Sequence, residues 1–304
     1  MTLGRWLAVA AFASFASATA AQSDYTLLVF GDSGTGDEDQ KLVAAAMAQA
    51  CATNSCDAAL VLGDLIYPRG VESAEDSLFR TNFEEPYAAF GRFPFWMSPG
   101  NHDHKGSVDA QIAYARSGVS ERWRMPAAYY AVEGLPTWLH IYSLDTEAFA
   151  RKQNAADRTQ ADQARAALCG KPGWRLLAGH HPIYSNGVHG SNAAVGTYLE
   201  ALIRDCDVQA FFAGHDHHQE HISAANYFEQ FVQGAAAKLR TVKTAKDPAE
   251  GITQRFARRT LGFAIATFRE RTMDVRFFDG TNGSATQIYQ CRATIDAPAC
   301  MPAP

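Results

Sequence analysis

Five short apolar runs in this chain each lead into a glycine that is followed by Asp, Asn or His. The five junctions are Gly31-Asp32, Gly63-Asp64, Gly100-Asn101, Gly179-His180 and Gly214-His215. Continuous apolar runs of this length are typical of strands that are buried on both faces. Polar groups resist burial unless they are paired, so their repeated position at strand ends needs a chemical reason.

The apolar runs alternate with helical patterns, which indicates an α/β fold with layers packed on a sheet. The expected strands are residues 25–30, 58–62, 93–97, 138–144, 175–178 and 208–213, and the expected helices are 39–52, 159–168 and 192–204. The tail differs, because 262–270, 271–279 and the turn 279–283 are typical of antiparallel strands and a hairpin. We expect one domain over residues 22–304, with these last strands extending a second sheet. The polar segment 146–158 is expected to be a surface loop, or a loop running into the next helix.

Composition places the chain among globular proteins. With 304 residues, of which 47% are hydrophobic and 19% charged, the chain can bury a large core. The formal net charge of −5 and the absence of any Lys/Arg run argue against nucleic acid or an anionic membrane as a partner. An anionic substrate would therefore have to be held by local chemistry.

The N-terminus has the pattern of a secretory signal peptide. An apolar stretch over residues 6–18 follows a basic residue, and a small-x-small motif ends at Ala20, so we expect cleavage after Ala20 or Ala21 and removal of residues 1–21. A membrane anchor is the weaker interpretation, because the stretch is shorter than the ~20 residues of a spanning helix. We therefore expect a secreted or periplasmic monomer without a stable membrane anchor.

The cysteines form an even set, and export permits disulfides. The six are Cys51, Cys56, Cys169, Cys206, Cys291 and Cys300. Local spacing suggests that Cys51 pairs with Cys56 and Cys291 with Cys300. This leaves Cys169 for Cys206, although other pairings exist. No CxxC spacing occurs, so neither thiolate zinc binding nor thiol redox chemistry is expected. Buried free thiols are the alternative.

The carboxyl ends of strands collect ligands in open α/β sheets, so the five junctions should meet at one rim. They would bring together two carboxylates, an amide, several imidazoles and the phenol of Tyr67. Oxygen and nitrogen donors without thiolates suit Zn, Fe or Mn, and Asp64 can bridge two ions. The glycine before each ligand allows a tight turn. Each motif alone is common in ordinary turns, but five in this order predict a metal centre.

Together the motifs resemble the five-block signature of the calcineurin-like metallophosphoesterases. The blocks are Asp32-x-Gly34, Gly63-Asp64-x-x-Tyr67, Gly100-Asn101-His102-Asp103, an apolar run into His180, and Gly214-His215-x-His217. Many members of this superfamily have a histidine ligand at the position of Gly34. The combination of Gly34 with Tyr67 resembles the pattern of the purple acid phosphatases. Residues 100–130 and 179–190 resemble the small tartrate-resistant type. One departure is small, because Leu177 replaces the usual Val and should not alter His180.

This resemblance, which spans most of the mature chain, implies a two-sheet β-sandwich flanked by helices, with four layers in the order α/β/β/α. It also implies a secreted acid phosphatase that hydrolyses phosphate monoesters, releases inorganic phosphate and uses metal-activated water as the nucleophile. A ferric ion would be held by Asp32, Asp64, Tyr67 and His217. A divalent ion (Fe, Zn or Mn) would be held by Asp64, Asn101, His180 and His215. A Tyr67 phenolate would colour the protein purple or pink, whereas a core tyrosine with a satisfied hydroxyl is the alternative.

Two further histidines, His102 and His189, match positions near the reacting phosphate in this family. Their implied roles are phosphate binding and protonation of the leaving alkoxide. Asp103 is expected to orient His102, and His189 would otherwise be an ordinary loop histidine. His181 is expected to point away from the ligands. No role is assigned to His104, His140, His218 and His221.

Other functions compete with this interpretation. A metal-dependent phosphodiesterase is disfavoured by Tyr67 and by Gly34, because Gly34 stands where many members of the superfamily have a histidine ligand. An extracellular iron-binding or redox protein would have no use for His102 and His189, because a storage site needs no groups aimed at a leaving oxygen. A structural or adhesion protein would follow only from the finding that no metal binds.

Overall fold

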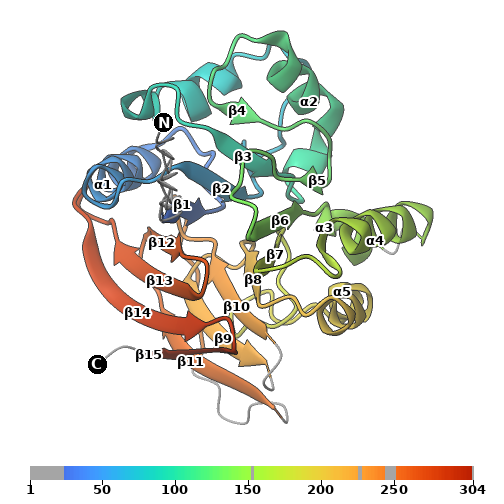
Figure 1. Cartoon of the computed structure of the whole chain (residues 1–304). Coiled ribbons are helices and arrows are strands. Elements are labelled where there is room, and N and C mark those ends of the chain that lie inside the picture. Colours follow the sequence, from blue (N-terminus) through green and yellow to red (C-terminus); the bar gives the residue numbers. More distant parts are fainter. Residues whose placement is uncertain (1–23, 152–153, 225–227, 244–250, 303–304) are drawn as a thin grey trace, which may run out of the picture.

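The structure is a computed structural model that describes residues 24–151, 154–224, 228–243 and 251–302. Two mixed sheets lie face to face with helices outside them (Figure 1). The first sheet contains, in order, β15 (Ala297–Pro302), β14 (Thr286–Thr294), β13 (Thr272–Asp279), β12 (Gly262–Phe268), β1 (Tyr25–Phe30), β2 (Ala58–Leu62), β3 (Phe95–Ser98) and β4 (Trp123–Arg124). The second contains, in order, β11 (Ile252–Arg258), β9 (Gln219–Ala224), β10 (Phe228–Gln233), β8 (Ala210–Ala213), β7 (Trp174–Ala178), β6 (Leu139–Ser143) and β5 (Tyr130–Ala131). The expected signal peptide and its cleavage site lie outside the described residues.

Three groups of buried apolar side chains hold the layers together. One group lies between the sheets and joins residues such as Leu60 of β2 to Phe212 of β8. A second packs helix α1 (Glu38–Asn54) and helix α2 (Val108–Ser117) against the outer face of the first sheet. A third packs α4 (Asn154–Leu168) and α5 (Ala193–Asp205) on the outer face of the second. The four-layer α/β/β/α sandwich implied by the resemblance is therefore confirmed.

The helices begin at residues whose side chains accept a hydrogen bond from the first turn. The side chain of Asp37 accepts from the backbone N–H of Gln40 at the start of α1, and that of Asn192 accepts from the backbone N–H of Val195 at the start of α5. Such caps satisfy backbone donors that have no partner inside the helix. Among the described residues, no helix is both long and apolar enough to cross a membrane.

The C-terminal strands occupy a different place from the one that the sequence predicts. Strand β12 pairs antiparallel with β1, so β12 to β15 extend the first sheet rather than the second. The physical reason is that β2 and β3 are added on one side of β1 and leave its other edge unpaired. A strand buried on both faces cannot leave that row of backbone groups without partners.

The segment 146–158 is not a loop over its first part. Helix α3 (Thr146–Ala150) begins here, and its first four residues are buried. Asp145 caps this helix by accepting from the backbone N–H of Glu147. Residues 152–153 lie outside the described part, and α4 begins at Asn154. The polar composition of this segment therefore conceals a short helix that packs against α4 and α5.

All six cysteines are paired, and the pairing suggested by local spacing is confirmed. The bonds are Cys51–Cys56, Cys169–Cys206 and Cys291–Cys300. The second bond joins the end of α4 to the end of α5, so it ties together two helices on the outer face of the second sheet.

Candidate metal centre

The five Gly-containing junctions meet at one edge of the sandwich, although they come from both sheets. Strands β1, β2 and β3 of the first sheet supply the first three junctions, and β7 and β8 of the second supply the last two. The unusual backbone lies on the polar residues, because φ is 58° at Asp32, 50° at Asp64 and 68° at His215. Positive φ is costly for residues other than glycine and is commonly retained at functional sites.

Of the five glycines at these junctions, Gly63 alone has a positive φ, so the prediction that glycine makes each tight turn holds there only. The others provide space for neighbours. A Cβ on Gly214, for example, would lie 2.6 Å from Oδ2 of Asp32. Gly34 has the same role, since its Cβ would overlap the carbonyl of Leu65. A histidine at position 34 would therefore require a different path for the backbone.

Three predicted donors gather around the hydroxyl of Tyr67, which is itself the fourth. This oxygen lies 2.7 Å from Asp64 Oδ2, 3.1 Å from Asp32 Oδ1 and 3.4 Å from His217 Nε2. His217 Nε2 is in turn 3.3 Å from Asp32 Oδ1. These are the four residues that the resemblance implies for the ferric ion, and we name them the first donor set.

The other predicted donors gather around the side-chain oxygen of Asn101. Its Oδ1 is 3.1 Å from His180 Nε2 and 3.1 Å from His215 Nδ1. The two imidazole nitrogens are 3.1 Å apart, and His180 Nε2 is 3.4 Å from Asp64 Oδ1. Asp64 thus offers one oxygen to each group of donors. We name Asp64, Asn101, His180 and His215 the second donor set.

The orientation of His180 shows that these residues fit a cation. Its Nδ1 lies 2.8 Å from the carbonyl of Leu62, which can only accept a hydrogen bond, so Nε2 carries the lone pair of the neutral ring. That lone pair faces the acceptor oxygens of Asn101 and Asp64. Acceptors that face one another in a buried site need a positive charge between them. The carboxylates of Asp64 and Asp32 raise the pKa of His180 against the lowering effect of burial, which reflects the same demand for positive charge.

The phenol of Tyr67 is held neutral by its surroundings. Burial raises its pKa well above 10, and the negative charges of Asp32 and Asp64 raise it further. A phenolate at this position would therefore depend on a strongly charged cation nearby.

His102 and His189 lie beside the donor sets. The ring of His102 lies 4.5 Å from the ring of Tyr67, and its Nδ1 is 2.6 Å from the carbonyl of Pro68. The ring of His189 lies 4.3 Å from that of His215. Burial lowers the pKa of His189, and Arg240 lowers it further while Asp216 opposes the change. Both histidines therefore lie next to residues of the donor sets.

Asp103 does not contact His102 as the sequence predicts. Its buried carboxylate instead accepts hydrogen bonds from the backbone N–H groups of Leu65, Ile66 and Gly100 and from the side chain of Gln111. Because the backbone donors adjoin Asp64, Tyr67 and Asn101 in the chain, this carboxylate holds two ligand-bearing loops. The prediction that it orients the His102 ring directly is wrong.

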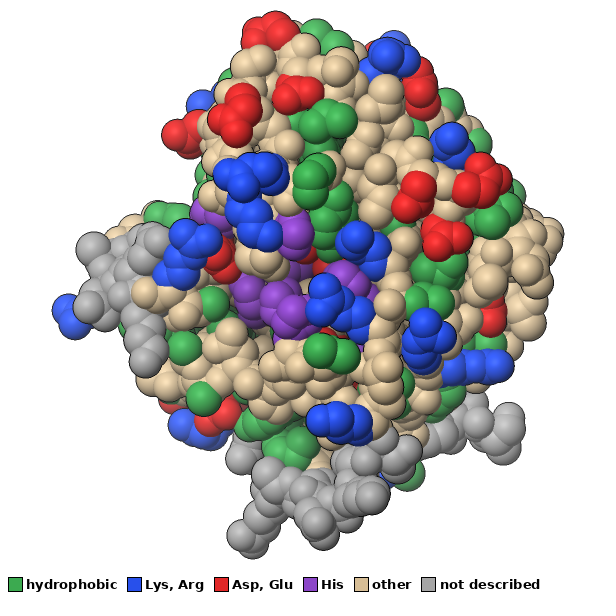
Figure 2. Space-filling view, turned by 180° about the vertical axis from the view of Figure 1, so that it is seen from behind, with side chains coloured by type: hydrophobic (Ala, Val, Ile, Leu, Met, Phe, Trp, Pro, Cys, Tyr) green, Lys and Arg blue, Asp and Glu red, His purple; other side chains and the backbone are tan. Residues whose placement is uncertain are grey.

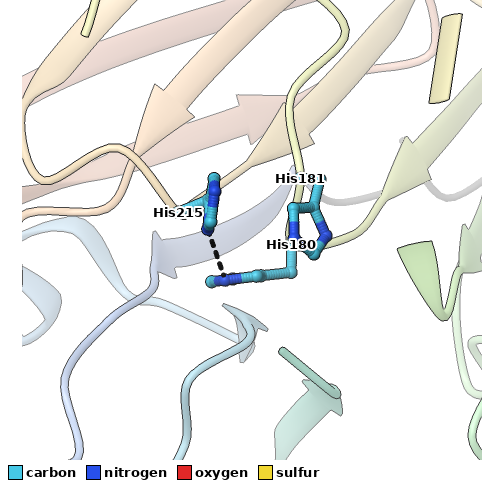
Figure 3. A group of neighbouring side chains, drawn as sticks. All are labelled: His180, His181 and His215. Carbon is cyan, nitrogen blue, oxygen red and sulfur yellow. Dashed lines mark hydrogen bonds between the residues drawn. The ribbon is translucent and has the colours of Figure 1, made fainter. Parts of the chain in front are cut away.

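His181 lies closer to the donors than the sequence predicts. Figure 3 shows its ring beside His180 and His215, and the His181 and His215 ring centroids are 4.4 Å apart. Nitrogen atoms of these three histidines lie within 4.8 Å of one another, as do donor atoms of Asp32, Asp64 and His180. The nitrogens of His181 face other partners, because Nδ1 lies 3.1 Å from the Thr146 hydroxyl and Nε2 lies 3.4 Å from the Glu147 carboxylate. We therefore place His181 behind the second donor set, where it supports His215.

The four histidines without an assigned role have partners outside the donor sets. His104 contacts Asp145, His140 the Pro172 carbonyl, His218 Glu220, and His221 Glu229. Sequence reasoning missed Asp216, which is buried and accepts from the Ser185 hydroxyl and the His189 backbone N–H. Its position between His215 and His217 was the available signal. It also missed the cations Lys238 and Arg240, for which no motif gives a signal.

Comparisons with known proteins agree with this geometry. Residues 25–219 match the family model of the calcineurin-like phosphoesterases. Tartrate-resistant acid phosphatase type 5 of Mus musculus is 32% identical over 209 residues, which cover 62% of this chain and 63% of the relative. Purple acid phosphatase 3 of Arabidopsis thaliana is 26% identical over 276 residues, 84% of this chain and 74% of the relative. The match thus spans less than two thirds of the length of the mouse protein.

Two solved structures show the same fold. GAP50, the anchor in the inner membrane complex of Plasmodium, has a TM-score of 0.78 at 19% identity, with 90% of each chain covered. Purple acid phosphatase PPD1 from yellow lupin seeds has a TM-score of 0.68 at 15% identity, covering 90% of this chain and 54% of that one. Since the family model covers well over half of the sequence, this chain belongs to the calcineurin-like phosphoesterases and is homologous to the tartrate-resistant and purple acid phosphatases.

Proposed function

We propose that this protein is an acid phosphatase that hydrolyses phosphate monoesters at a centre holding Fe(III) and a divalent ion (Fe, Zn or Mn). The observation that carries the proposal is the pair of donor sets that share Asp64, with the hydroxyl of Tyr67 in the first set. When bound, such a pair of cations would hold the ester and lower the pKa of a water molecule for attack on phosphorus.

The residues around the donor sets would bind the substrate and handle protons. The carbonyl of Pro68 can accept a hydrogen bond from the Nδ1–H of His102, and Nε2, which lies 3.1 Å from the Lys105 ammonium, would bind a phosphate oxygen when it is protonated. His189, on a loop held by the carboxylate of Asp216, would carry the proton for the leaving alkoxide. A leaving group of high pKa needs this proton, whereas p-nitrophenolate does not.

We also propose that the protein is exported and acts as a monomer on phosphate esters, with no nucleic acid partner and no membrane anchor. The three disulfides support export, because such bonds persist in oxidising compartments. The single domain over 22–304 remains part of the same proposal.

The first test is the visible absorption spectrum of purified protein whose metals have been counted, compared between wild type and Tyr67→Phe. We expect a broad visible band that disappears in the variant. Tyr142→Phe is the matched control, because this buried tyrosine contacts Gln163 in another part of the fold, and it should keep the band. A colourless wild type that contains two zinc or manganese ions and still hydrolyses esters would contradict the Fe(III) assignment.

The second test compares p-nitrophenyl phosphate, its bis ester and an alkyl phosphate. We expect the monoester to be preferred to the bis ester, and His189→Ala to reduce kcat more for the alkyl phosphate, by about a hundredfold. His140→Ala, whose ring contacts Pro172, is the control. Preference for the bis ester would favour the phosphodiesterase alternative. Unchanged hydrolysis after substitution of both His102 and His189 would refute the proton-transfer roles.

A further inference from the structure

The loop 185–190, which carries His189, lies beside the candidate metal centre. Figure 2 shows histidine side chains gathered in one patch at the surface, and His189 itself is exposed. The centroid of its ring is 4.3 Å from that of His215 and 6.4 Å from that of His217. Residues 185–190 belong to no helix or strand. Contacts with other segments must therefore fix the place of the His189 ring.

A buried carboxylate, that of Glu220 in β9, holds this loop at Asn186. Its Oε2 accepts from the backbone N–H of Asn186 at 3.1 Å, and its Oε1 accepts from the side-chain amide of the same residue at 2.7 Å. At the other end of the loop, the backbone N–H of His189 donates to Asp216 at 2.9 Å. The loop is thus held by two carboxylates, one at Asn186 and one at His189.

The Glu220 carboxylate also contacts the segments on either side of this loop. Its Oε2 lies 3.0 Å from Nε2 of His218, the residue after His217, and an ionised carboxylate can only accept, so this nitrogen carries the hydrogen. The side-chain amide of Gln254 in β11 donates to Oε1 at 2.6 Å. Each carboxylate oxygen therefore accepts two hydrogen bonds. Glu220 joins the His189 loop to the segment that follows the predicted ligand His217.

The charge of Glu220 is stabilised by these donors. Its side chain is completely buried, and among the described residues no Lys or Arg forms an ion pair with it. A buried carboxylate is costly unless donors compensate it, and buried charges are often no more stabilising than apolar residues of the same size. A role in fixing the neighbouring loop is therefore a better reason for this residue than stability alone.

We propose that Glu220 is a positioning residue for phosphate-ester hydrolysis, which sets the place of His189 at the leaving oxygen through its contacts with Asn186. The inference rests on the proposed phosphatase function. A misplacement of about 1 Å can cost about a hundredfold in rate. Because His189 would carry a proton, its displacement should slow only the esters whose leaving group needs that proton.

The test measures kcat and KM for p-nitrophenyl phosphate and an alkyl phosphate in wild type, Glu220→Gln and Asn186→Ala. In Glu220→Gln an NH₂ group replaces an oxygen that accepts two hydrogen bonds, so it opposes two donors without a change in size. We expect kcat for the alkyl phosphate to fall about tenfold or more. The kcat for p-nitrophenyl phosphate and both KM values should change by less than about twofold. Metal content should stay at the wild-type level.

The double variant of Glu220→Gln and Asn186→Ala tests whether the two residues act together. Both substitutions break the same contact, so the double variant should lose no more than the larger of the two single losses. Losses that multiply would show that Glu220 acts on the reaction by a route other than Asn186 and would overturn the inference.

Glu229→Gln is the matched control. Glu229 is another buried glutamate of the second sheet, in β10, and its Oε2 lies 2.6 Å from His221 Nε2 and 2.6 Å from the Ser223 hydroxyl. These partners lie outside the loop 185–190. The control therefore shares any loss of stability caused by a buried glutamine with unsatisfied neighbours, but it should not change the preference between the two esters.

Amide hydrogen exchange gives a readout that does not need turnover. Whichever way the new side chain of Glu220→Gln points, it loses one of the two hydrogen bonds to Asn186. The amides of the loop 185–190 should therefore exchange about fivefold faster than in wild type. Exchange in this loop should stay unchanged in Glu229→Gln.

The outcomes separate this inference from the proposed function. Equal losses of kcat for both esters in Glu220→Gln, or the same selective loss in Glu229→Gln, would overturn the positioning role. So would a wild-type kcat for the alkyl phosphate in Glu220→Gln, and the phosphatase function would then still stand. If the wild type hydrolyses neither ester, the proposed function fails, and unchanged exchange in the loop would then separately overturn the role of Glu220 in holding it.

Discussion

Asp103 offers the sharpest test of how the ligand-bearing loops are held. Its buried carboxylate accepts from the backbone N–H groups of Leu65, Ile66 and Gly100 and from the side-chain amide of Gln111, at distances of 2.8 to 3.3 Å. Alanine would leave these four donors without an acceptor. At about 1 kcal/mol for each unsatisfied buried donor, the free energy of unfolding should fall by about 4 kcal/mol. Asparagine keeps one acceptor oxygen and should cost about half as much.

The assay is denaturant unfolding of wild type, Asp103→Ala and Asp103→Asn, followed by fluorescence. Asp162→Ala is the control, because this carboxylate is exposed on α4, and its loss should change stability by no more than about 0.5 kcal/mol. Metal content should also fall in the folded Asp103→Ala protein, since the loops carrying Asp64 and Asn101 lose their shared anchor. A loss of less than about 1 kcal/mol with full metal content would refute the reasoning, because it would show that water or rearrangement satisfies the donors.

Three further outcomes follow from the structure. Gly34→Ala should unfold at a denaturant concentration clearly below that of wild type, by about 2 kcal/mol or more, because its Cβ would overlap a backbone carbonyl; wild-type stability would show that the loop can move. Burial lowers the pKa of His104, but Asp145 raises it above 6.5, so the charged pair stabilises the fold below pH 6.5 and this contribution is lost as the pH rises through the higher folded-state value. His104→Asn should therefore cost more stability at pH 5.5 than at pH 8.5 in urea unfolding, and an equal cost at both would contradict this. Replacing Cys169 and Cys206 by serine should cost about 3 to 4 kcal/mol, as expected for a bond that closes a loop across a separation of 37 residues, and an unchanged melting temperature would contradict it.

The parts of the site that depend on strand ends could be predicted from the sequence. A strand buried on both faces needs a continuous apolar run, and Asp32, Asp64, Asn101, His180 and His215 each follow one. Because these ends meet in space, the predicted donors do come together. The disulfide pairing was also predictable, since cysteines close in sequence left one remaining pair.

Other features depend on contacts that leave no local pattern. The positive φ at Asp64 is one of them, because glycine is the residue that ordinarily adopts such a backbone conformation. The residues of α3 are buried because the Thr146 hydroxyl accepts from the backbone N–H groups of His180 and His181, a contact across 34 and 35 residues. Strand β12 joins the first sheet because it pairs with the edge of β1 that β2 leaves unpaired. The position of Lys238 over Tyr67 depends on a loop far along the chain.

The division of the donors between the two sheets has a kinetic consequence. Asp32, Asp64, Tyr67 and Asn101 follow strands of the first sheet, whereas His180, His215 and His217 follow strands of the second. A complete set of ligands therefore exists only after the two sheets have docked. Bound ions would then stabilise the native state but not a transition state in which the sheets are still apart, so they should slow unfolding and leave the folding rate nearly unchanged. The centre would therefore form late in folding and extend the lifetime of the folded protein.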